Sequence, residues 1–339
     1  MSGSRLAATA PVAGSRILGV GAYRPSRVVL NDEVAALIGS SDEWIRRRSG
    51  IAARRYAGPD ETLVGMATAA SVKALAQAGV TADAVDLVLL ATMSHLEQSP
   101  AAAPTVAHRI GAVSAGAVDV SAACAGFCHA LALADAQIRS GNSRHVVVVG
   151  VERMTDIVDP TDRGTAFLFG DGAGAVVVGP SGSPGIGPVV WGADGERRGV
   201  IAHSGSWLEL REPVPQHGGR AWPTLRMDGP AVFRWAVGAV PAVGRRALAA
   251  SGLAPDDLAA FIPHQANLRI IEAAATALGL PPRVAVARDI VDSGNTSAAS
   301  IPLAMERLLS QGTVASGGLA LLVGFGAGLV HAAQVVALP

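Results

Sequence analysis

The chain alternates short, almost wholly apolar runs with longer stretches in which small and apolar residues recur at helical spacing. The apolar runs are typical of strands buried on both faces of a sheet. They predict strands over Arg16–Val20, Leu87–Thr92, Val118–Val120, His145–Gly150, Ala173–Val178, Ala260–Ile262, Leu319–Val323 and His331–Val336. The periodic stretches predict helices over Leu63–Gly79, Ala123–Gly141, Ala231–Gly252, Leu268–Leu278 and Ser297–Gln311. Such alternation favours an α/β fold with buried mixed sheets.

A weak internal repeat indicates two similar halves that pack against each other. Leu75–Asp83 (LAQAGVTAD) is echoed by Leu248–Asp256 (LAASGLAPD), at an offset of 248 − 75 = 173 residues. At the same offset, the predicted strand from Val146 falls on the one from Leu319 (319 − 146 = 173). A shared offset is the signature of a duplicated unit. The predicted halves are residues 16–186 and residues 187–339. A surface excursion is predicted at residues 180–230, where the two halves join.

Composition and charge exclude several classes of function. Half of the 339 residues are hydrophobic and 16% are charged, which is typical of a compact enzyme and not of a disordered chain. The 27 basic and 27 acidic side chains balance, which disfavours nonspecific binding to nucleic acid. Lys73 is the sole lysine, and a coding bias toward alanine and arginine explains this better than selection for phosphate contacts.

Cysteine usage and the two chain ends bear on the compartment. Cys124 and Cys128 stand about one helical turn apart and make a poor disulfide pair, which favours a reducing, cytoplasmic setting. Met1–Gly14 has no long apolar run after a charged start, so we expect a frayed tail and not a signal peptide. Leu319–Leu338 is apolar, but glycines and polar residues interrupt it, which favours two buried strands over a membrane span.

Cys124 is the candidate nucleophile. It lies in Ser121–Phe127 (SAACAGF), among small residues, after a predicted strand and at the expected start of a helix. The helix macrodipole and the free backbone N–H groups at such a start favour the thiolate. From this feature alone, a small buried hydrophobic role fits Cys124 equally well, and we assign Cys128 to the core.

Three further segments carry candidate catalytic residues. His264 ends a predicted strand within Phe261–Arg269 (FIPHQANLR), where α/β active sites collect polar groups, and a plain loop histidine is the alternative. Asn295 precedes a helix of tiny residues and maps within two residues of Cys124 (295 − 173 = 122), with an ordinary N-cap as the alternative. Gly324–Gly328 (GFGAG) lets a backbone amide approach an oxyanion, or is simply a tight hairpin.

Together these segments resemble the β-ketoacyl-acyl-carrier-protein synthase III family, which has the thiolase fold. The match runs from Arg16 to the end of the chain, and the pattern is similar to actinobacterial members, including priming ketosynthases of aromatic type II polyketide pathways. Further matching motifs are Ser41–Ile45 (SDEWI), Ser49–Ile51 (SGI), Asp162–Gly164 (DRG) and Phe169–Gly174 (FGDGAG). The resemblance implies a layered αβαβα core, a homodimer, and no cofactor apart from a coenzyme A thioester used as substrate.

By this resemblance the chain is an initiating ketosynthase. Cys124 takes a short acyl group from acyl-coenzyme A, and malonyl-acyl carrier protein then loses carbon dioxide and condenses with it, for polyketide or fatty acid biosynthesis. His264 and Asn295 donate hydrogen bonds to the enolate oxygen, and Phe325 crowds the leaving carboxylate. The amides of Cys124 and Ala327 bind the oxyanion. Many relatives have glycine where Ala327 stands, but only the N–H is needed.

The resemblance also assigns binding roles. Trp44 and Arg163 sandwich the adenine of coenzyme A and Arg48 contacts a phosphate, although a run of arginines is usually a solvated face. Arg269 belongs to the surface that docks the carrier protein. Ser99 stands where the family sends a loop across the dimer interface into the partner's acyl pocket. Because the Ser99 side chain is small, we expect starters longer or more branched than acetyl.

Other functions use the same residue types. A degradative thiolase needs a second cysteine late in the chain, and none follows Cys128, whereas an elongating synthase has a histidine where Asn295 stands. An acyltransferase or a thioesterase-like hydrolase that uses Cys124 without condensation stays open. Release of free acid with no malonyl acceptor distinguishes the hydrolase. A non-catalytic partner subunit usually lacks the nucleophile, which is present here.

Overall fold

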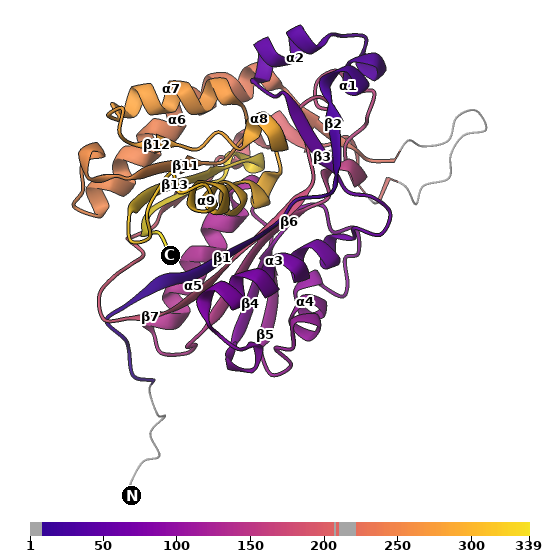
Figure 1. Ribbon diagram of the computed structural model, residues 1–339. Coiled ribbons are helices and arrows are strands. Elements are labelled where there is room, and N and C mark those ends of the chain that lie inside the picture. Colours follow the sequence, from indigo (N-terminus) through magenta and orange to yellow (C-terminus); the bar gives the residue numbers. More distant parts are fainter. Residues whose placement is uncertain (1–8, 207, 210–221) are drawn as a thin grey trace, which may run out of the picture.

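Two five-stranded mixed sheets frame the computed structural model, which describes residues 9–206, 208–209 and 222–339 (Figure 1). The first sheet contains, in spatial order, β1 (Gly14–Tyr23), β7 (Gly172–Ser181), β6 (Val146–Glu152), β4 (Leu87–Ala91) and β5 (Gly116–Val120). The second contains β8 (Val190–Gly192), β14 (His331–Ala337), β13 (Leu319–Phe325), β11 (Ala260–Pro263) and β12 (Ala285–Val286). Each sheet has two antiparallel pairs followed by two parallel pairs, so the two sheets share one topology.

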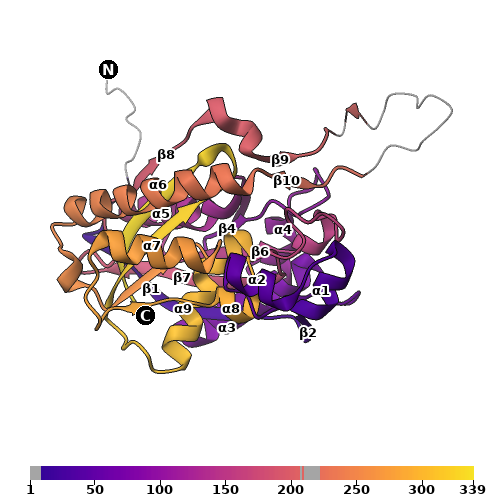
Figure 2. The ribbon, with the colours of Figure 1, turned by 90° about the horizontal axis from the view of Figure 1, so that it is seen from above.

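Helices cover the outer face of each sheet and fill the space between the sheets (Figures 1 and 2). The outer helices are α3 (Leu63–Ala78) and α4 (Ala102–Ile110) on the first sheet, and α6 (Gly229–Ala250) and α7 (Leu268–Leu278) on the second. The middle layer consists of α5 (Gly126–Arg139) and α9 (Ser300–Ser310). Both middle helices contact strands of both sheets. The predicted αβαβα layering is therefore confirmed.

The apolar runs are buried on both faces, as their composition predicts. In β6, Val148 belongs to the central core around α5 and α9, whereas Val147 and Val149 belong to the core under α3 and α4. In β13, Leu322 faces the centre and Leu321 faces α6 and α7. Successive strand residues point to opposite faces, so a strand between two helical layers is apolar at every position.

Smaller elements lie at the ends of the strands and between the halves. They are β2 (Arg27–Leu30), α1 (Asn31–Ile38), α2 (Asp42–Ser49), β3 (Ala53–Tyr56), β9 (Ile201–His203), β10 (Leu225–Met227), α8 (Ile290–Ser293) and the 3₁₀ turns η1 (Ala82–Ala84), η2 (Ala123–Ala125), η3 (Met154–Asp156), η4 (Gly195–Val200), η6 (Pro255–Asp257), η7 (Ser297–Ala299) and η8 (Ala327–Leu329). The excursion contains β8, η4, β9 and β10, and β9 pairs with β10. Trp207 and His217 of the excursion lie outside the described residues.

Where the observed elements differ from the predicted ones, the causes are local. The predicted helices Ala123–Gly141 and Ser297–Gln311 each begin as a 3₁₀ turn, because Ala123 and Ser297 adopt left-handed φ values of 45° and 46°. The predicted tail overlaps β1 at Gly14. β8 and β12 have only three and two residues, too few to give a strand pattern. In the described part of the chain, no helix is long and apolar enough to cross a bilayer.

Gly150 tests the packing of the first half against the second. A Cβ at this position in β6 would lie 2.8 Å from the carbonyl carbon of Ala298, so the backbone must move. We expect Gly150→Ala to lower the free energy of unfolding by roughly 1–3 kcal/mol, the usual cost of overpacking. Urea denaturation measures this change in the free energy of unfolding. Gly182→Ala, where an added Cβ meets nothing within 4 Å, is the matched control and should be near neutral. Equal stability of the two variants would contradict the packing argument.

Candidate active site

Cys124 lies in a sharp turn between β5 and α5. Its neighbour Ala123 has a φ of 45°, and α5 begins two residues later at Gly126. A Cβ at Gly126 would lie 2.9 Å from the Cβ of Ala91, so glycine is needed for the helix to start this close to β4. Backbone N–H groups at the start of a helical turn have no partner within it. The small residues of the SAACAGF segment therefore bring a thiol and free amides to the same point.

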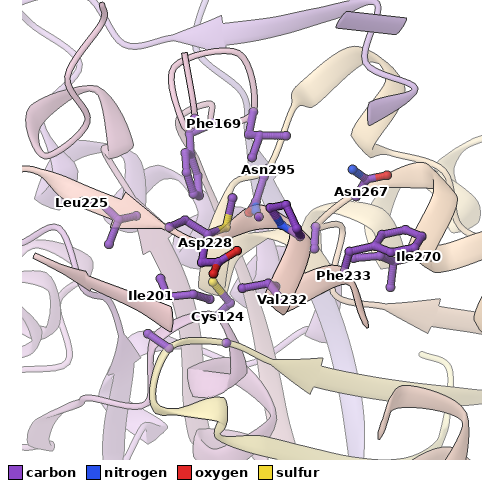
Figure 3. A pocket seen from close by; sticks show the side chains of 18 of the residues that line it. Cys124, Phe169, Ile201, Leu225, Asp228, Val232, Phe233, Asn267, Ile270 and Asn295 are labelled. Carbon is purple, nitrogen blue, oxygen red and sulfur yellow. The ribbon is translucent and has the colours of Figure 1, made fainter. Parts of the chain in front are cut away.

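The predicted site residues, with one exception, line a single cavity of about 690 Å³. In Figure 3, side chains from both halves surround one space, among them Cys124, Asn295, Phe233 and Asp228. The predicted residues in this wall are Trp44, Arg48, Cys124, Arg163, His264, Arg269, Asn295, Phe325 and Ala327. Ser99 is not among the lining residues and is exposed on the surface.

His264 follows the last residue of β11 and is 2% exposed. Its backbone N–H donates to the Val323 carbonyl at 2.8 Å, and its Nδ1 lies 2.7 Å from the Ser300 hydroxyl. That hydroxyl also accepts the N–H of Gln265 at 3.2 Å. Since Ser300 has one proton of its own to donate, the network assigns it to Nδ1 and places the ring proton on Nε2. Burial lowers the pKa of His264 to about 3, so the ring is neutral and offers an N–H donor.

Asn295 is held on both sides by backbone hydrogen bonds. Its N–H donates to the Leu168 carbonyl at 2.8 Å, and its carbonyl accepts the N–H of Gly170 at 3.0 Å. The side-chain Oδ1 accepts the N–H of Ser297 at 2.8 Å. The amide oxygen is therefore occupied, and the NH₂ group is the part left to donate. Asn295 thus makes a cap-like hydrogen bond and also lines the cavity, so the two alternatives from the sequence are not exclusive.

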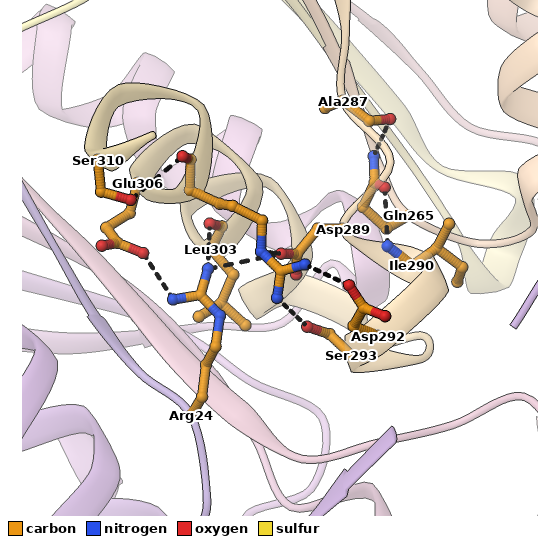
Figure 4. A network of polar contacts seen from close by, with 11 residues as sticks. Arg24, Gln265, Ala287, Asp289, Ile290, Asp292, Ser293, Leu303, Glu306 and Ser310 are labelled. Atoms are coloured by element: carbon orange, nitrogen blue, oxygen red, sulfur yellow. Dashed lines mark hydrogen bonds and ion pairs between the residues drawn. The ribbon is translucent and has the colours of Figure 1, made fainter. Parts of the chain in front are cut away.

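A polar network fixes the segments that carry His264 and Asn295 (Figure 4). Gln265 donates to the carbonyls of Pro263 and Ala287 and accepts the N–H of Ile290, the first residue of α8. Asp289, which is 2% exposed, pairs with Arg307 of α9 at 2.5 Å and with Arg24 at 3.5 Å. The turn from α8 to Asn295 is therefore tied to α9 and to the end of β1.

The glycine turn after β13 packs directly on the nucleophile. A Cβ at Gly326 would lie 2.8 Å from the backbone nitrogen of Cys124, so only glycine allows this approach. Ala327 then opens η8 and lines the same cavity as Cys124. The Phe325 ring meets the His264 ring edge-on, with centroids 5.1 Å apart and planes at 72°. β13, this turn and β14 form the predicted pair of buried strands.

The structure corrects the expected ionisation of the nucleophile. Cys124 lies in η2, ahead of α5, and is 9% exposed. Burial is the main cause that raises the pKa of the Cys124 thiol to about 12; interaction with the Ser297 side chain opposes this rise, and the nearby Glu152 carboxyl adds to it. The resting cysteine is therefore a thiol, because desolvation outweighs the helix start. Cys128 is fully buried in the central core, as predicted.

The cavity mouth carries a tryptophan and several arginines. The Arg163 guanidinium lies over the Trp44 ring, 5.0 Å from its centroid. A base placed between them needs roughly 7 Å, two layers of van der Waals contact, so the pair must open to hold one. The Arg269 guanidinium lies over the Phe233 ring, 4.9 Å from its centroid. Arg48 accepts a hydrogen bond from Asn267 at its backbone carbonyl, and its side chain lines the cavity.

The excursion supplies a wall that the sequence did not predict. Ile201 of β9, Leu225 and Met227 of β10, and Asp228 line the cavity. Asp228 caps α6 by accepting the Ala231 N–H at 3.0 Å. The Asp-Gly-Pro sequence at the head of a long apolar helix was the available signal for this cap, since aspartate at N-cap and proline in the first turn mark helix starts.

Comparison with known proteins decides the family. The family model "3-oxoacyl-[acyl-carrier-protein (ACP)] synthase III" matches residues 118–195, and its C-terminal counterpart matches residues 248–338. The β-ketoacyl-[acyl-carrier-protein] synthase III of Streptomyces glaucescens is 52% identical over 339 residues, which is 100% of both chains. The chain belongs to the β-ketoacyl-[acyl-carrier-protein] synthase III family. Synthase III 1 of Streptomyces coelicolor is 54% identical over 331 residues, 96% of each chain.

A solved structure extends the synthase III match to the whole fold. The crystal structure of the priming β-ketosynthase from the R1128 polyketide biosynthetic pathway superposes with a TM-score of 0.95, at 52% identity and over 98% of each chain. The family resemblance and the thiolase fold expected from the sequence are therefore confirmed. The protein is an acyl-condensing enzyme of the synthase III type.

The buried imidazole predicts a pH-dependent stability. An unfolded histidine has a pKa of about 6.5, so below that pH the unfolded chain binds a proton that folded His264 refuses until about pH 3. Stability is therefore lost as pH falls from about 6.5, by up to about 1.4 kcal/mol per pH unit from this group. We expect His264→Gln to flatten that slope in urea unfolding between pH 6.5 and 4.5. An unchanged slope would show that His264 titrates normally.

Proposed function

We propose that the enzyme is an initiating ketosynthase, which condenses a short acyl group from acyl-coenzyme A with malonyl-acyl carrier protein. The observation that carries the proposal is the convergence of a thiol, a neutral imidazole and a carboxamide in one cavity whose mouth holds Trp44 and Arg163. The product is a β-ketoacyl-acyl carrier protein for polyketide or fatty acid biosynthesis. The likeness to the R1128 priming β-ketosynthase favours the polyketide role.

In the first half-reaction, Cys124 attacks the thioester carbonyl. The new bond joins Sγ to the acyl carbon, the bond to the coenzyme A sulfur breaks, and the thiol proton leaves with coenzyme A. The oxyanion of the tetrahedral intermediate lies between the amides of Cys124 and Ala327, which the close packing of Gly326 brings together. Trp44 and Arg163 hold the adenine and Arg48 contacts a phosphate.

In the second half-reaction, the malonyl group loses carbon dioxide, and the electron pair of the broken bond forms a thioester enolate. His264 Nε2–H and the Asn295 NH₂ donate to the enolate oxygen, and Phe325 makes the space around the carboxylate apolar. The enolate carbon attacks the acyl-Cys124 carbonyl. Collapse releases the Cys124 sulfur, which takes up a proton and restores the thiol.

The partner surfaces follow from the same geometry. Arg269 stands at the cavity mouth and is proposed to meet the acidic surface of the carrier protein. β5 is an edge strand of its sheet among the described residues, and nearby Val113 and Val118 are 75% and 52% exposed. This apolar edge supports a homodimer, with Ser99 reaching the partner's acyl pocket. We also propose a cytoplasmic setting, supported by the two free cysteines, and two halves at residues 16–186 and 187–339.

The two half-reactions should separate by mutation. Incubation with an acyl-coenzyme A and intact-mass measurement should show one acyl group on the wild type and none on Cys124→Ala. His264→Ala and Asn295→Ala should still acylate but lose roughly 10²–10³-fold in decarboxylation of malonyl-acyl carrier protein, the typical loss on removing one oxyanion donor. Steady release of free acid from acyl-coenzyme A alone, or transfer to a small alcohol or amine, would instead indicate a hydrolase or another acyltransferase.

The small side chain at Ser99 predicts a roomy acyl pocket. We expect acylation by butyryl- and isobutyryl-coenzyme A to match or exceed acylation by acetyl-coenzyme A, measured as initial rates by intact mass. Ser99→Phe should shift the preference toward acetyl, by roughly tenfold or more if two methylenes are excluded. Ser183→Phe, on an exposed turn far along the chain, is a control for an added surface ring. A clear wild-type preference for acetyl would refute the hypothesis.

A further inference from the structure

The turn at residues 159–165 brings Arg163 to the cavity mouth, and two aspartates fix the backbone of this turn. Asp159 and Asp162 each accept the backbone N–H of the residue two positions later, at 2.9 Å in both cases. Each also accepts a threonine hydroxyl, at 2.7 Å and 2.9 Å. Aspartates that bond the backbone two residues on stabilise tight turns. The backbone on both sides of Arg163 is therefore held, while its side chain is exposed.

Arg226 of β10 joins both aspartates to the wall of the cavity. Its Nη1 lies 2.8 Å from Asp162 Oδ2, and its Nη2 lies 3.2 Å from Asp159 Oδ2. One guanidinium thus spans two carboxylates with two of its nitrogens, a geometry that a single ammonium nitrogen cannot reproduce. Leu225 and Met227, on either side of Arg226 in the chain, line the cavity. The ion pairs therefore connect the turn that carries Arg163 to the excursion.

Arg226 also keeps the two aspartates from competing for Arg163. In the described part of the chain, both aspartates pair with Arg226, and Arg163 pairs with neither of them. The Arg163 guanidinium lies over the Trp44 ring instead, 5.0 Å from its centroid. An exposed ion pair and an exposed cation–π contact are similar in strength, so an unpaired carboxylate next to Arg163 in the chain would compete with the ring.

Trp44 is the fixed member of the pair. Its backbone N–H donates to the Ser41 hydroxyl, the N-cap of α2, at 3.2 Å. Its ring meets the Phe167 ring edge-on, with centroids 5.0 Å apart and planes at 71°. Trp44 is half-buried, whereas Arg163 is exposed, so the Arg163 side chain is the part that must move to admit a base. A ring face and a guanidinium can then stack a base from its two sides.

We propose that Arg226 is a positioning residue for the nucleotide end of coenzyme A, and that it holds the turn at residues 159–165 so that the Arg163 side chain can open from Trp44 and close on the base. The inference rests on the proposed function, since the base that enters is the adenine of coenzyme A. Arg226 does not line the cavity, so its effect on the substrate passes through Arg163.

The test compares two butyryl thioesters that share the pantetheine arm. Butyryl-coenzyme A has the adenine nucleotide, and butyryl-pantetheine lacks it. Intact-mass measurement of acylation at a series of concentrations gives a maximal rate and a half-saturating concentration for each. For Arg226→Gln we expect the half-saturating concentration of butyryl-coenzyme A to rise roughly fivefold at an unchanged maximal rate, since partly exposed ion pairs are lost. Both constants for butyryl-pantetheine should stay within about twofold of the wild type.

Three further variants show how Arg226 acts. Arg226→Lys keeps the charge on one nitrogen and should recover part of the loss. Arg283→Gln is the matched control and should equal the wild type, because Arg283 bonds the Asp256 carboxylate and carbonyl at 2.7 Å and neither residue lines the cavity. In an Arg163→Ala background, adding Arg226→Gln should change the half-saturating concentration less than about twofold, because Arg163 is already lost.

Equal weakening of both thioesters by Arg226→Gln would overturn the proposal, because the wall at Leu225 and Met227 would then be disturbed. Full additivity with Arg163→Ala would contradict it as well, because Arg226 would then act on the substrate directly. Unchanged saturation by butyryl-coenzyme A in Arg226→Gln would refute the role while leaving the proposed function intact.

Calorimetric titration with coenzyme A separates this inference from the proposed function. We expect the Kd of coenzyme A to rise roughly fivefold in Arg226→Gln, as the half-saturating concentration does. If the Kd rises in this way but the wild type forms no β-ketoacyl product, the proposed function fails and the positioning role stands. If the wild type does not bind coenzyme A, the positioning role fails too.

Discussion

Contact between the strand ends of each half and the 3₁₀ turn of the other half governs the structure. β6 of the first half packs on η7 of the second, and β13 of the second packs on η2 of the first. A Cβ at Gly150 would collide with the Ala298 carbonyl, and one at Gly324 would lie 3.0 Å from the Cα of Ala125. The two glycines stand 174 residues apart (324 − 150 = 174), close to the offset of the internal repeat. Because these contacts leave no space for large side chains, η2 and η7 consist of small residues. Cys124 in η2 and Asn295 just before η7 line the same cavity.

A symmetric scaffold therefore carries an asymmetric site. α5 starts at Gly126 and α9 at Ser300, so the local offset is 174, one more than the repeat seen in the sequence. At this offset, Cys124 corresponds to Ala298, and the left-handed Ala123 corresponds to Ser297. One turn supplies the thiol, and the other supplies hydroxyls that bind the imidazole and the buried Glu152 carboxyl. Similarly, β6 ends at Glu152 and β13 at Phe325 (325 − 152 = 173), a carboxylate in one half and a phenyl ring in the other.

Local patterns in the sequence were enough for most strands of the two sheets and for Cys124, His264 and Asn295, whereas the layering and the other cavity residues came from the family resemblance. Runs such as the valines of β6 are apolar at every position because both faces are covered, and His264 and Asn295 stand at strand and helix boundaries. The protonation of Cys124 could not be predicted, because it depends on burial and on Glu152, 28 residues away (152 − 124 = 28). The cavity wall from the excursion could not be predicted either. Short strands such as β9 and β10 form because they pair with each other, and their own sequences show no strand pattern.

In the proposed reaction, an imidazole without charge favours decarboxylation. A malonyl carboxylate that enters among Phe325, Phe169 and Trp235 loses water and gains no cation from the imidazole, because burial keeps His264 neutral. When the carboxylate leaves as carbon dioxide, its charge is removed from the apolar space. The electron pair of the broken bond moves to the enolate oxygen, which faces the N–H donors of His264 and Asn295. A protonated His264 would instead attract the carboxylate and stabilise the ground state as well. The hydroxyl of Ser300, which fixes the proton on Nε2, therefore has a role of its own in the proposed reaction.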